Sequence, residues 1–297
     1  MILGIDIGGT NIKTALVYEN NESVDFKYYS KTPTLAKKRQ GEGILKKVLE
    51  IVSEYQLKFA ITGVAISTAG VVSGQTFEIL YANENIPYYK GINFSTEIMN
   101  TFGLPCVVEN DVNAATLGEW KYGAGKEGSS ILCLTVGTGI GGGLILENNL
   151  YRGFSYCAAE IGYMKLGDST FENLASTQQL IKRVKSKKND SQIDGEEIFR
   201  LAKDGDEDCQ KAIQELIKQL CLGISNCVYL VNPEKVILGG GIMEQKEYLL
   251  PRIQREFEQI FSNRIGKPEI LVASLGNSAC LAGVYWLFNS FYGKNKL

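Results

Sequence analysis

An aspartate followed by two glycines lies close to the N-terminus, in the run Asp6-Ile7-Gly8-Gly9-Thr10. Glycines let backbone N–H groups approach a phosphate because no Cβ is in the way, and the hydroxyl of Thr10 is a further donor. Asp6 would then hold Mg²⁺ through water, while Lys13 would add positive charge nearby. The same residues could instead form a tight hairpin turn with an aspartate cap. No Gly-Lys-Ser/Thr sequence follows, and an apolar run typical of a strand comes next, so the motif is neither a P-loop nor a Rossmann fingerprint.

Two further glycine turns follow apolar runs that are typical of buried strands. They are Gly137-Thr138-Gly139-Ile140-Gly141-Gly142-Gly143 and Gly239-Gly240-Gly241. Glycine is unfavourable inside a sheet, so several in succession indicate either a bulge or the close approach of a ligand. A glycine turn between a strand and a helix is also a common place for the base and ribose of a nucleotide. Each could be a plain turn, but three at the ends of separate buried strands favour phosphate binding.

Several carboxylates could act on hydroxyl groups. Asp111 comes directly after an apolar strand and begins a helix, in the run Glu109-Asn110-Asp111-Val112-Asn113. The plain interpretation is a helix N-cap. A carboxylate at such a junction can also accept a proton from an alcohol that attacks a phosphoryl group, with Asn110 helping to hold it. Glu160 and Glu172 could bind further hydroxyls, since carboxylate oxygens accept hydrogen bonds from sugar diols, or each could be a solvated surface charge.

The 297 residues include no histidine. That absence excludes Ser-His-Asp and Cys-His nucleophilic sites, HExxH zinc sites and two-His-one-carboxylate iron sites. A general base must therefore be another group, and a carboxylate is the first candidate. The seven cysteines form no Cys-x-x-Cys pair, so buried thiols in a reducing cytosol are expected rather than a disulfide framework or a zinc ribbon.

Charge and length bound the partners and the architecture. Lys and Arg total 31 and Asp and Glu total 33, so no basic excess is available to offset nucleic-acid phosphates or an anionic membrane. Asp6 also stands where a signal peptide would need apolar residues. We therefore expect a soluble, cytoplasmic protein without nucleic-acid or membrane partners. Its length is typical of two domains or one large α/β unit.

Short apolar runs alternate with amphipathic segments along the chain, which is typical of an α/β layer structure with strands buried on both faces. Strands are expected over 2–7, 12–18, 26–30, 60–67, 106–109, 131–136, 144–146, 235–238 and 269–274, and helices over 43–56, 174–186, 195–203, 206–231, 248–262 and 278–289. The strand, glycine turn and strand over 131–146 repeat the pattern at the N-terminus, which suggests two domains built on one plan.

As a set, these motifs resemble the ROK family of sugar kinases and sugar-responsive repressors, within the actin/Hsp70/hexokinase superfamily. The matching segments are DIGGTNIKTALV at the start, VENDVNAATLGE at 108–119, LTVGTGIGGGLIL at 134–146, YRG at 151 through AAEIGYMKLG, ENLAS at 172–176, NPEKVILGGGI at 232–242 and LGNSACLAGVYWL at 275–287. Their order and spacing cover essentially the whole chain.

The resemblance implies two RNase-H-like α/β domains flanking a cleft, which we place at 1–110 with 279–297 and at 111–278. It implies that ATP is held by residues of the three glycine turns, namely Asp6, Gly8, Gly9, Thr10, Lys13, Gly137, Thr138, Gly139, Gly239, Gly240 and Gly241. It also implies that Asp111 is the catalytic base. The residues implied to bind the sugar are Gly70, Asn83, Asn110, Asp111, Glu160, Tyr163 and Glu172.

Three positions depart from the family pattern. Many members have a histidine at the position of Tyr163 and a cysteine cluster that binds structural zinc with it, but here that cluster is replaced by LGDSTFEN. A zinc site needs several nitrogen or sulfur ligands, so no zinc is expected. Ala69-Gly70 stands where the family has Pro-Gly. Because the family histidine contacts the sugar near C1 and C2, Tyr163 leads to the hypothesis that a β-glucoside is accepted.

The resemblance therefore implies an ATP- and Mg²⁺-dependent kinase that phosphorylates a primary hydroxyl, O6, of a hexose or hexose derivative of the glucose, β-glucoside or N-acetylmannosamine type. Family repressors carry a DNA-binding domain ahead of the first motif, and a start at Asp6 leaves no space for one, so a repressor is not expected. The alternatives are a non-catalytic sugar-binding regulatory protein and an ATPase acting on a protein or acyl-CoA partner. Relatives are commonly dimers, so a homodimer is expected.

Overall fold

The computed structural model describes residues 1–20, 23–261 and 266–293. The chain divides into two compact units. The first unit comprises Met1–Lys126, Arg152–Ala158 and Asn277–Leu297, and the second unit comprises Glu127–Tyr151 and Ala159–Gly276. Residues 294–297 of the predicted first domain, and residue 262 at the end of the predicted helix 248–262, lie outside the described residues.

The sheet of the first unit has the spatial order β3-β2-β1-β4-β7. Its strands are β1 (Ile2–Ile7), β2 (Asn11–Asn20), β3 (Ser23–Pro33), β4 (Gly63–Thr68) and β7 (Cys106–Asn110). β1 pairs antiparallel with β2 and parallel with β4, and β4 pairs parallel with β7. Every residue of β1 and β4 is buried, as expected for central strands covered on both faces.

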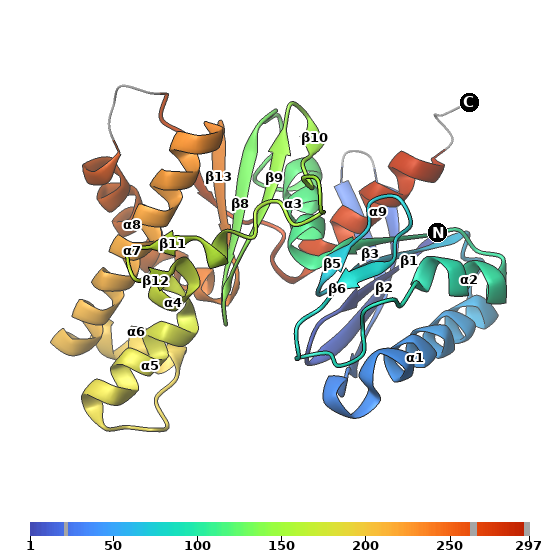
Figure 1. Cartoon of the computed structure of the whole chain (residues 1–297), viewed down its shortest axis with the longest axis horizontal. Coiled ribbons are helices and arrows are strands. Elements are labelled where there is room, and N and C mark those ends of the chain that lie inside the picture. The colour runs from blue at the N-terminus through green and yellow to red at the C-terminus, as the bar shows by residue number, and fades with distance from the viewer. Residues whose placement is uncertain (21–22, 262–265, 294–297) are drawn as a thin grey trace. The chain divides into compact units, whose positions relative to one another are not determined.

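Helices cover both faces of this sheet. The connections through α1 (Ala36–Lys58) and α2 (Phe94–Phe102) advance across the sheet in the same direction, so right-handed crossovers place both helices on one face (Figure 1). On the other face, α9 (Ala279–Tyr292) packs against β1, β2, β4 and β7. Apolar residues occupy almost every face of α9. The sheet buries one face of this helix, and α3 (Asp111–Tyr122) covers a second face.

Two glycines let α3 and α9 pack with their backbones in close approach. A Cβ on Gly118 would collide with the carbonyl of Ala279, and a Cβ on Gly283 would collide with the carbonyl of Ala114. This packing makes α3 part of the first unit, whereas the predicted boundary after residue 110 assigned α3 to the second domain. The segment Arg152–Ala158 likewise belongs to the first unit.

The sheet of the second unit repeats the plan of the first. Its strands are β8 (Ile131–Val136), β9 (Ile140–Leu146), β10 (Asn149–Leu150), β13 (Lys235–Gly239) and β14 (Glu269–Val272), in the order β10-β9-β8-β13-β14. The first strand is again antiparallel to its hairpin partner and parallel to the strand on its other side. The predicted α/β fold, with two domains on one plan, is therefore confirmed.

The helices of the second unit are α4 (Phe171–Ala175), α5 (Thr177–Lys188), α6 (Gly195–Lys203), α7 (Glu207–Val231) and α8 (Lys246–Ile260) (Figure 1). The predicted helix 174–186 is two helices here. Ser176 has extended backbone angles, and its side chain caps α5 by accepting a hydrogen bond from the backbone N–H of Gln179. A serine that can bond to nearby backbone competes with helix continuation, which explains the break.

Two other sequence predictions are corrected. Gly141, Gly142 and Gly143 lie within β9 rather than in a turn, because they pair with β8, and a Cβ on Gly142 would fall 2.5 Å from the carbonyl oxygen of Ala159. Glycine there serves close backbone packing. Cysteines are mostly buried as expected, but Cys157 is exposed.

Among the described residues, none of the helices combines the length and apolar character that crossing a membrane would require.

Candidate functional site

The carboxylate of Asp6 lies at the end of β1, where the first glycine turn begins. β1 and β2 pair Asp6 directly opposite Lys13, so the hairpin itself brings the two side chains to the same face. Asp6 Oδ2 lies 3.3 Å from Lys13 Nζ, and Asp6 Oδ1 accepts a hydrogen bond from Ser67 Oγ at 3.1 Å. Lys13 Nζ also donates to Asn277 Oδ1 at 3.3 Å. The result is a nearly buried carboxylate paired with a half-buried ammonium group beside the turn.

Hydrogen bonds from Thr34 hold the first glycine turn in place within the first unit. Its hydroxyl donates to the carbonyl oxygen of Gly8 at 2.6 Å, and its backbone N–H donates to the carbonyl oxygen of Thr10 at 2.8 Å. Thr34 is fully buried, and Arg39 Nη1 donates to its carbonyl oxygen at 3.0 Å. The carbonyls on both sides of Gly9 are thus held. Sequence reasoning missed Thr34, because a threonine at the end of an edge strand carries no distinctive signal.

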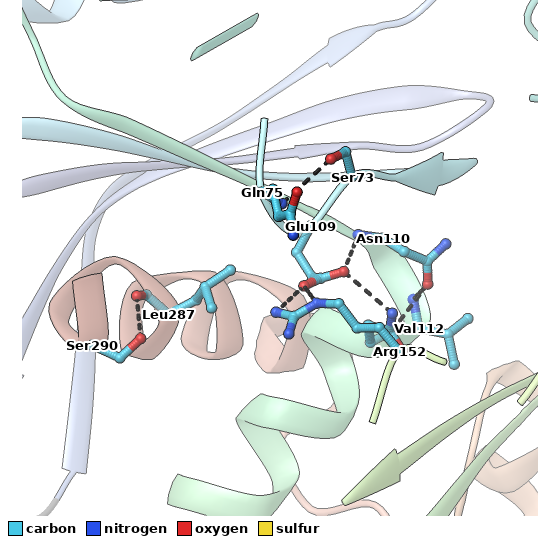
Figure 2. A network of polar contacts seen from close by, with 9 residues as sticks. Ser73, Gln75, Glu109, Asn110, Val112, Arg152, Leu287 and Ser290 are labelled. Atoms are coloured by element: carbon cyan, nitrogen blue, oxygen red, sulfur yellow. Dashed lines mark hydrogen bonds and ion pairs between the residues drawn. The ribbon is translucent and has the colours of Figure 1, made fainter. Parts of the chain in front are cut away.

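Asp111 begins α3 directly after β7, as the sequence predicted, but it is not the N-cap. Asn110 is the cap, since its Oδ1 accepts hydrogen bonds from the N–H groups of Val112 at 2.9 Å and Asn113 at 3.0 Å (Figure 2). Asn110 Nδ2 donates to Asp111 Oδ1 at 3.1 Å, and the N–H of Val112 donates to the same oxygen at 3.0 Å. Because Asn110 takes the capping role, the carboxylate of Asp111 is held in place without being the cap.

The thiol of Cys280 contacts the backbone of Asp111 and lies within the electrostatic influence of Asp6. Cys280 Sγ donates to the backbone carbonyl oxygen of Asp111 at 3.5 Å. Burial, and then the negative charges of Asp6 and Asp111, raise the pKa of this thiol well above its ordinary value. The charges of both carboxylates are thus felt at one sulfur atom, which places the first glycine turn and Asp111 in the same region of the first unit. Sequence reasoning did not identify Cys280.

Gly70 lies in the same region. Its carbonyl oxygen accepts a hydrogen bond from Asn110 Nδ2 at 2.9 Å. Its φ of 103° favours glycine, and a Cβ would also fall 2.6 Å from the carbonyl oxygen of Tyr81. The predicted sugar-binding residue Asn83 is exposed in the loop after β6 (Ile79–Tyr81), where its Oδ1 accepts from the N–H of Asn85 at 3.1 Å. The structure thus brings Gly70, Asn110 and Asp111 together and leaves Asn83 on a surface loop.

In the second unit, the two predicted glycine turns adjoin. The N–H of Gly137 donates to the carbonyl oxygen of Gly139 at 2.9 Å, and the carbonyl of Gly137 accepts from the N–H of Thr177 at 2.9 Å. Gly240 has a φ of 90°, and a Cβ there would fall 2.7 Å from the backbone nitrogen of Val136, the residue before Gly137. The two turns, Gly137-Thr138-Gly139 and Gly239-Gly240-Gly241, therefore pack against each other.

The predicted sugar carboxylates lie next to these turns. A Cβ on Gly139 would fall 2.6 Å from Glu172 Oε2, which shows that this carboxylate rests on the turn. Glu160 precedes the short 3₁₀ helix Ile161–Tyr163. Although Glu160 as a whole is exposed, partial burial of its carboxyl group and the negative charge of Glu172 raise its pKa above the ordinary value. The side chain of Tyr163 is exposed.

The raised pKa of Glu160 predicts a pH-dependent effect of Glu160→Gln. The folded protein binds this proton more tightly than the unfolded chain, so wild-type stability falls as pH rises from the ordinary value of 4.5 through the raised one. Below that window the carboxyl is protonated in both states and contributes nothing. We expect the free energy of unfolding of the variant to rise relative to wild type on going from about pH 3.5 to about pH 7. Urea unfolding at both pH values checks this, with exposed Glu147→Gln as the control; an unchanged difference between the two proteins contradicts it.

Asp6 and the groups around it can hold Mg²⁺ only through water. Asp6 offers a hard carboxylate, but both of its oxygens already have protein partners, Ser67 and Lys13. Mg²⁺ keeps several of its waters in phosphate sites, so the donor set fits an ion bound through water. In the described ranges, no group of three or more acidic or cysteine side chains gathers in a way that could bind a metal directly.

These arrangements can support phosphoryl transfer. The first unit combines a fixed carboxylate, Asp111, with a glycine turn, a lysine and an acidic group suited to a hydrated divalent cation. The second unit combines two adjoining glycine turns with two carboxylates, Glu160 and Glu172. Turns of this kind bind phosphate, carboxylates of this kind bind hydroxyls, and a carboxylate beside a phosphate can accept the proton of an attacking alcohol.

Comparisons with known proteins agree with this chemistry. A model of the ROK family matches residues 2–290. An uncharacterised protein of Clostridium perfringens is 40% identical over 98% of each chain. A β-glucoside kinase of Listeria monocytogenes is 30% identical, over 84% of this chain and 85% of its own.

A solved structure also matches closely in fold. The crystal structure of a ROK family glucokinase from Streptomyces griseus, in complex with glucose and AMPPNP, superposes with a TM-score of 0.81 at 28% identity. The match covers 96% of this chain and 98% of that one.

Proposed function

Because this chain belongs to the ROK family, we propose that it is an ATP-dependent carbohydrate kinase that phosphorylates O6 of a hexose or hexose derivative. One observation carries the proposal. The carboxylate of Asp111 is fixed by Asn110 at the β7–α3 junction, and its charge, with that of Asp6 in the first glycine turn, raises the pKa of the Cys280 thiol, which donates to the backbone carbonyl of Asp111. A fixed carboxylate close to a phosphate-binding turn is what proton transfer from an attacking alcohol requires.

In the proposed reaction, Asp111 accepts the proton of the sugar O6 as the bond from O6 to the γ-phosphorus forms. The bond from that phosphorus to the β,γ-bridging oxygen breaks, and ADP leaves with its electron pair. Backbone N–H groups of the turns at 8–10 and 137–139 bind the phosphate oxygens, and Lys13 adds positive charge. Mg²⁺, when bound, neutralises phosphate charge, and Asp6 would hold it through water.

Sugar recognition is proposed to rest on carboxylate and amide groups. Asn110, Glu160 and Glu172 bind hydroxyls, because their oxygens accept hydrogen bonds from O–H groups. Gly70 lies against Asn110, which supports a place beside the sugar, and Asn83 is a further proposed contact. The exposed ring of Tyr163 offers an apolar face, on which a second sugar ring or an aglycone can stack. We therefore propose that β-glucosides are accepted, in line with the similarity to the β-glucoside kinase of Listeria.

ADP release measured across a panel of sugars tests the proposal. The panel is glucose, mannose, N-acetylmannosamine and cellobiose, with ATP and Mg²⁺ and a control without sugar. We expect ADP release above the control with at least one sugar, and cellobiose among the accepted ones. Activity on glucose alone rejects the β-glucoside proposal and leaves the kinase proposal standing.

The remaining outcomes of the panel identify the alternatives. ADP release that does not depend on sugar indicates an ATPase with another acceptor. Sugar binding seen by calorimetry, without ADP release, indicates a sugar-binding regulatory protein. The homodimer, the cytoplasmic location and the lack of zinc stay predictions from the sequence.

A further inference from the structure

We propose that Arg152 and Glu109 form a positioning pair that holds the β7–α3 junction, and with it the base Asp111, in its reactive geometry. This inference rests on the proposed function. Neither residue is among those predicted to contact sugar or ATP. Figure 2 shows the pair, with the guanidinium of Arg152 reaching the carboxylate of Glu109 close to Asn110.

The two oxygens of Glu109 have separate partners. Oε2 accepts hydrogen bonds from Arg152 Nε at 2.8 Å and from Arg152 Nη2 at 2.6 Å. Oε1 accepts from the backbone N–H of Asn110 at 3.0 Å and from Asn113 Nδ2 at 3.2 Å. One oxygen is thus tied to Arg152, and the other to the first turn of α3 and the residue that caps it. A shift of Arg152 is therefore transmitted to the junction.

Burial makes this geometry hard to replace. Glu109 is 2% exposed, and a buried carboxylate is tolerated only when it is paired and hydrogen-bonded. The Arg152 side chain is itself largely buried, and a Cβ on Gly74 would lie 3.2 Å from Arg152 Cδ, so the arginine stem packs closely against that glycine.

The pair is connected to the base by a short series of bonds. Glu109 fixes the N–H of Asn110, and the side chain of Asn110 donates to Asp111 Oδ1 at 3.1 Å and to the carbonyl of Gly70 at 2.9 Å. A displacement of about 1 Å at a reacting group can lower a rate by about 10²-fold. Loss of the pair should therefore reduce turnover without removing any group that touches substrate.

Arg152 also has an informative place in the chain. It is the first residue of the segment Arg152–Ala158, which belongs to the first unit although the chain before and after it belongs to the second. The N–H of Ala158 donates to the carbonyl oxygen of Arg152 at 3.0 Å, which closes the segment on itself. The chain then reaches Glu160, a proposed sugar ligand, two residues later. Arg152 thus anchors the start of this segment within the first unit.

Two variants test the pair. Arg152→Lys keeps the charge but loses the fork of two N–H donors, because an ammonium group cannot reproduce the planar geometry. The double variant R152M/E109Q removes both charges, so no unpaired carboxylate is left buried, and the neutral amide that replaces the carboxylate needs no arginine partner. We expect kcat to fall at least about 10-fold in both variants, while KM for ATP changes less than about 2-fold, since the pair acts on the base and not on the glycine turns.

The control is Arg200→Lys. Arg200 also donates through Nε and Nη2 to a glutamate, Glu197, at 2.8 Å to Oε2 and 2.7 Å to Oε1, but on the exposed surface of α6. We expect the Arg200→Lys variant to keep the wild-type kcat. Thermal unfolding followed by circular dichroism confirms that each variant is folded at the assay temperature.

We measure kcat and KM with ATP and the sugar that gives the highest turnover in the panel. If either folded variant keeps wild-type kcat, or if kcat and the affinity for ATP fall together, the pair is not a positioning pair. A wild-type chain that shows no sugar-dependent ADP release overturns the proposed function and this role with it. An active wild type with equally active variants overturns the pair alone.

Discussion

Replacing Asp111 by asparagine is expected to lower kcat by at least about 10²-fold, the scale of losing a general base. Asparagine has the same shape, and its side-chain oxygen can still accept the hydrogen bonds that Asp111 Oδ1 receives from Asn110 and from the N–H of Val112. The junction should therefore stay folded, and only the ability to accept a proton is lost. Kinetic assays with saturating sugar measure kcat, and calorimetry with AMPPNP measures nucleotide binding, which we expect to be unchanged.

Asp194→Asn is the matched control for that experiment. Asp194 also stands at a helix start, where its side chain caps α6 by accepting from the N–H of Glu197 at 2.9 Å. Asparagine is an equally good N-cap, so we expect wild-type turnover and stability. Wild-type turnover in Asp111→Asn itself would remove Asp111 from the catalytic role.

The second large effect is expected from Gly283→Ala, which should lower the free energy of unfolding by about 2 kcal/mol or more. The added methyl group would collide with the carbonyl oxygen of Ala114 and would fall 2.8 Å from the backbone nitrogen of Gly118. Both obstacles are backbone atoms of α3, so no side chain can rotate away and the helices must separate. Helix propensity favours alanine by about 1 kcal/mol, which offsets only part of this strain.

Urea unfolding measures that loss, and Gly195→Ala supplies the control. Gly195 is also helical, but a Cβ there meets its nearest atoms at 3.7 Å and 3.8 Å, which is ordinary contact. We expect the control to keep the wild-type stability or to gain up to about 1 kcal/mol, since propensity favours alanine and nothing clashes. Because Asp111 begins α3, Gly283→Ala should reduce kcat as well. Unchanged stability in Gly283→Ala would contradict the close packing of α3 on α9.

The sequence predicted most of the fold because its strongest signals are local. Continuous apolar runs such as 2–7 and 131–136 are typical of buried strands, and α7 follows from a long amphipathic repeat. Two predictions failed where tertiary contact decides the outcome. The membership of α3 in the first unit depends on glycines that meet α9, which lies far along the chain. The placement of Gly141, Gly142 and Gly143 in β9 depends on their pairing with β8, and the glycine at 142 also lets the carbonyl of Ala159 approach closely.

The same distinction holds for the candidate site. Asp6, Asp111 and the glycine turns stand out because they follow directly on continuous apolar runs and recur as a set along the sequence. Thr34, Glu109 and Arg152 do not stand out, since a threonine, a glutamate in a strand and an arginine in a loop are common. Their importance arises from bonds between segments that are distant in sequence, such as Arg152 to Glu109 and Thr34 to Gly8. Pattern reading alone cannot detect such pairs.

A crystal structure of the full chain with AMPPNP, Mg²⁺ and the sugar of highest turnover tests the central proposal most directly. We expect the sugar O6 within hydrogen-bond distance of the Asp111 carboxylate and in line with the γ-phosphorus, with the phosphates on the N–H groups of residues 8–10. A sugar bound with another hydroxyl at Asp111, or bound away from that carboxylate altogether, would contradict it.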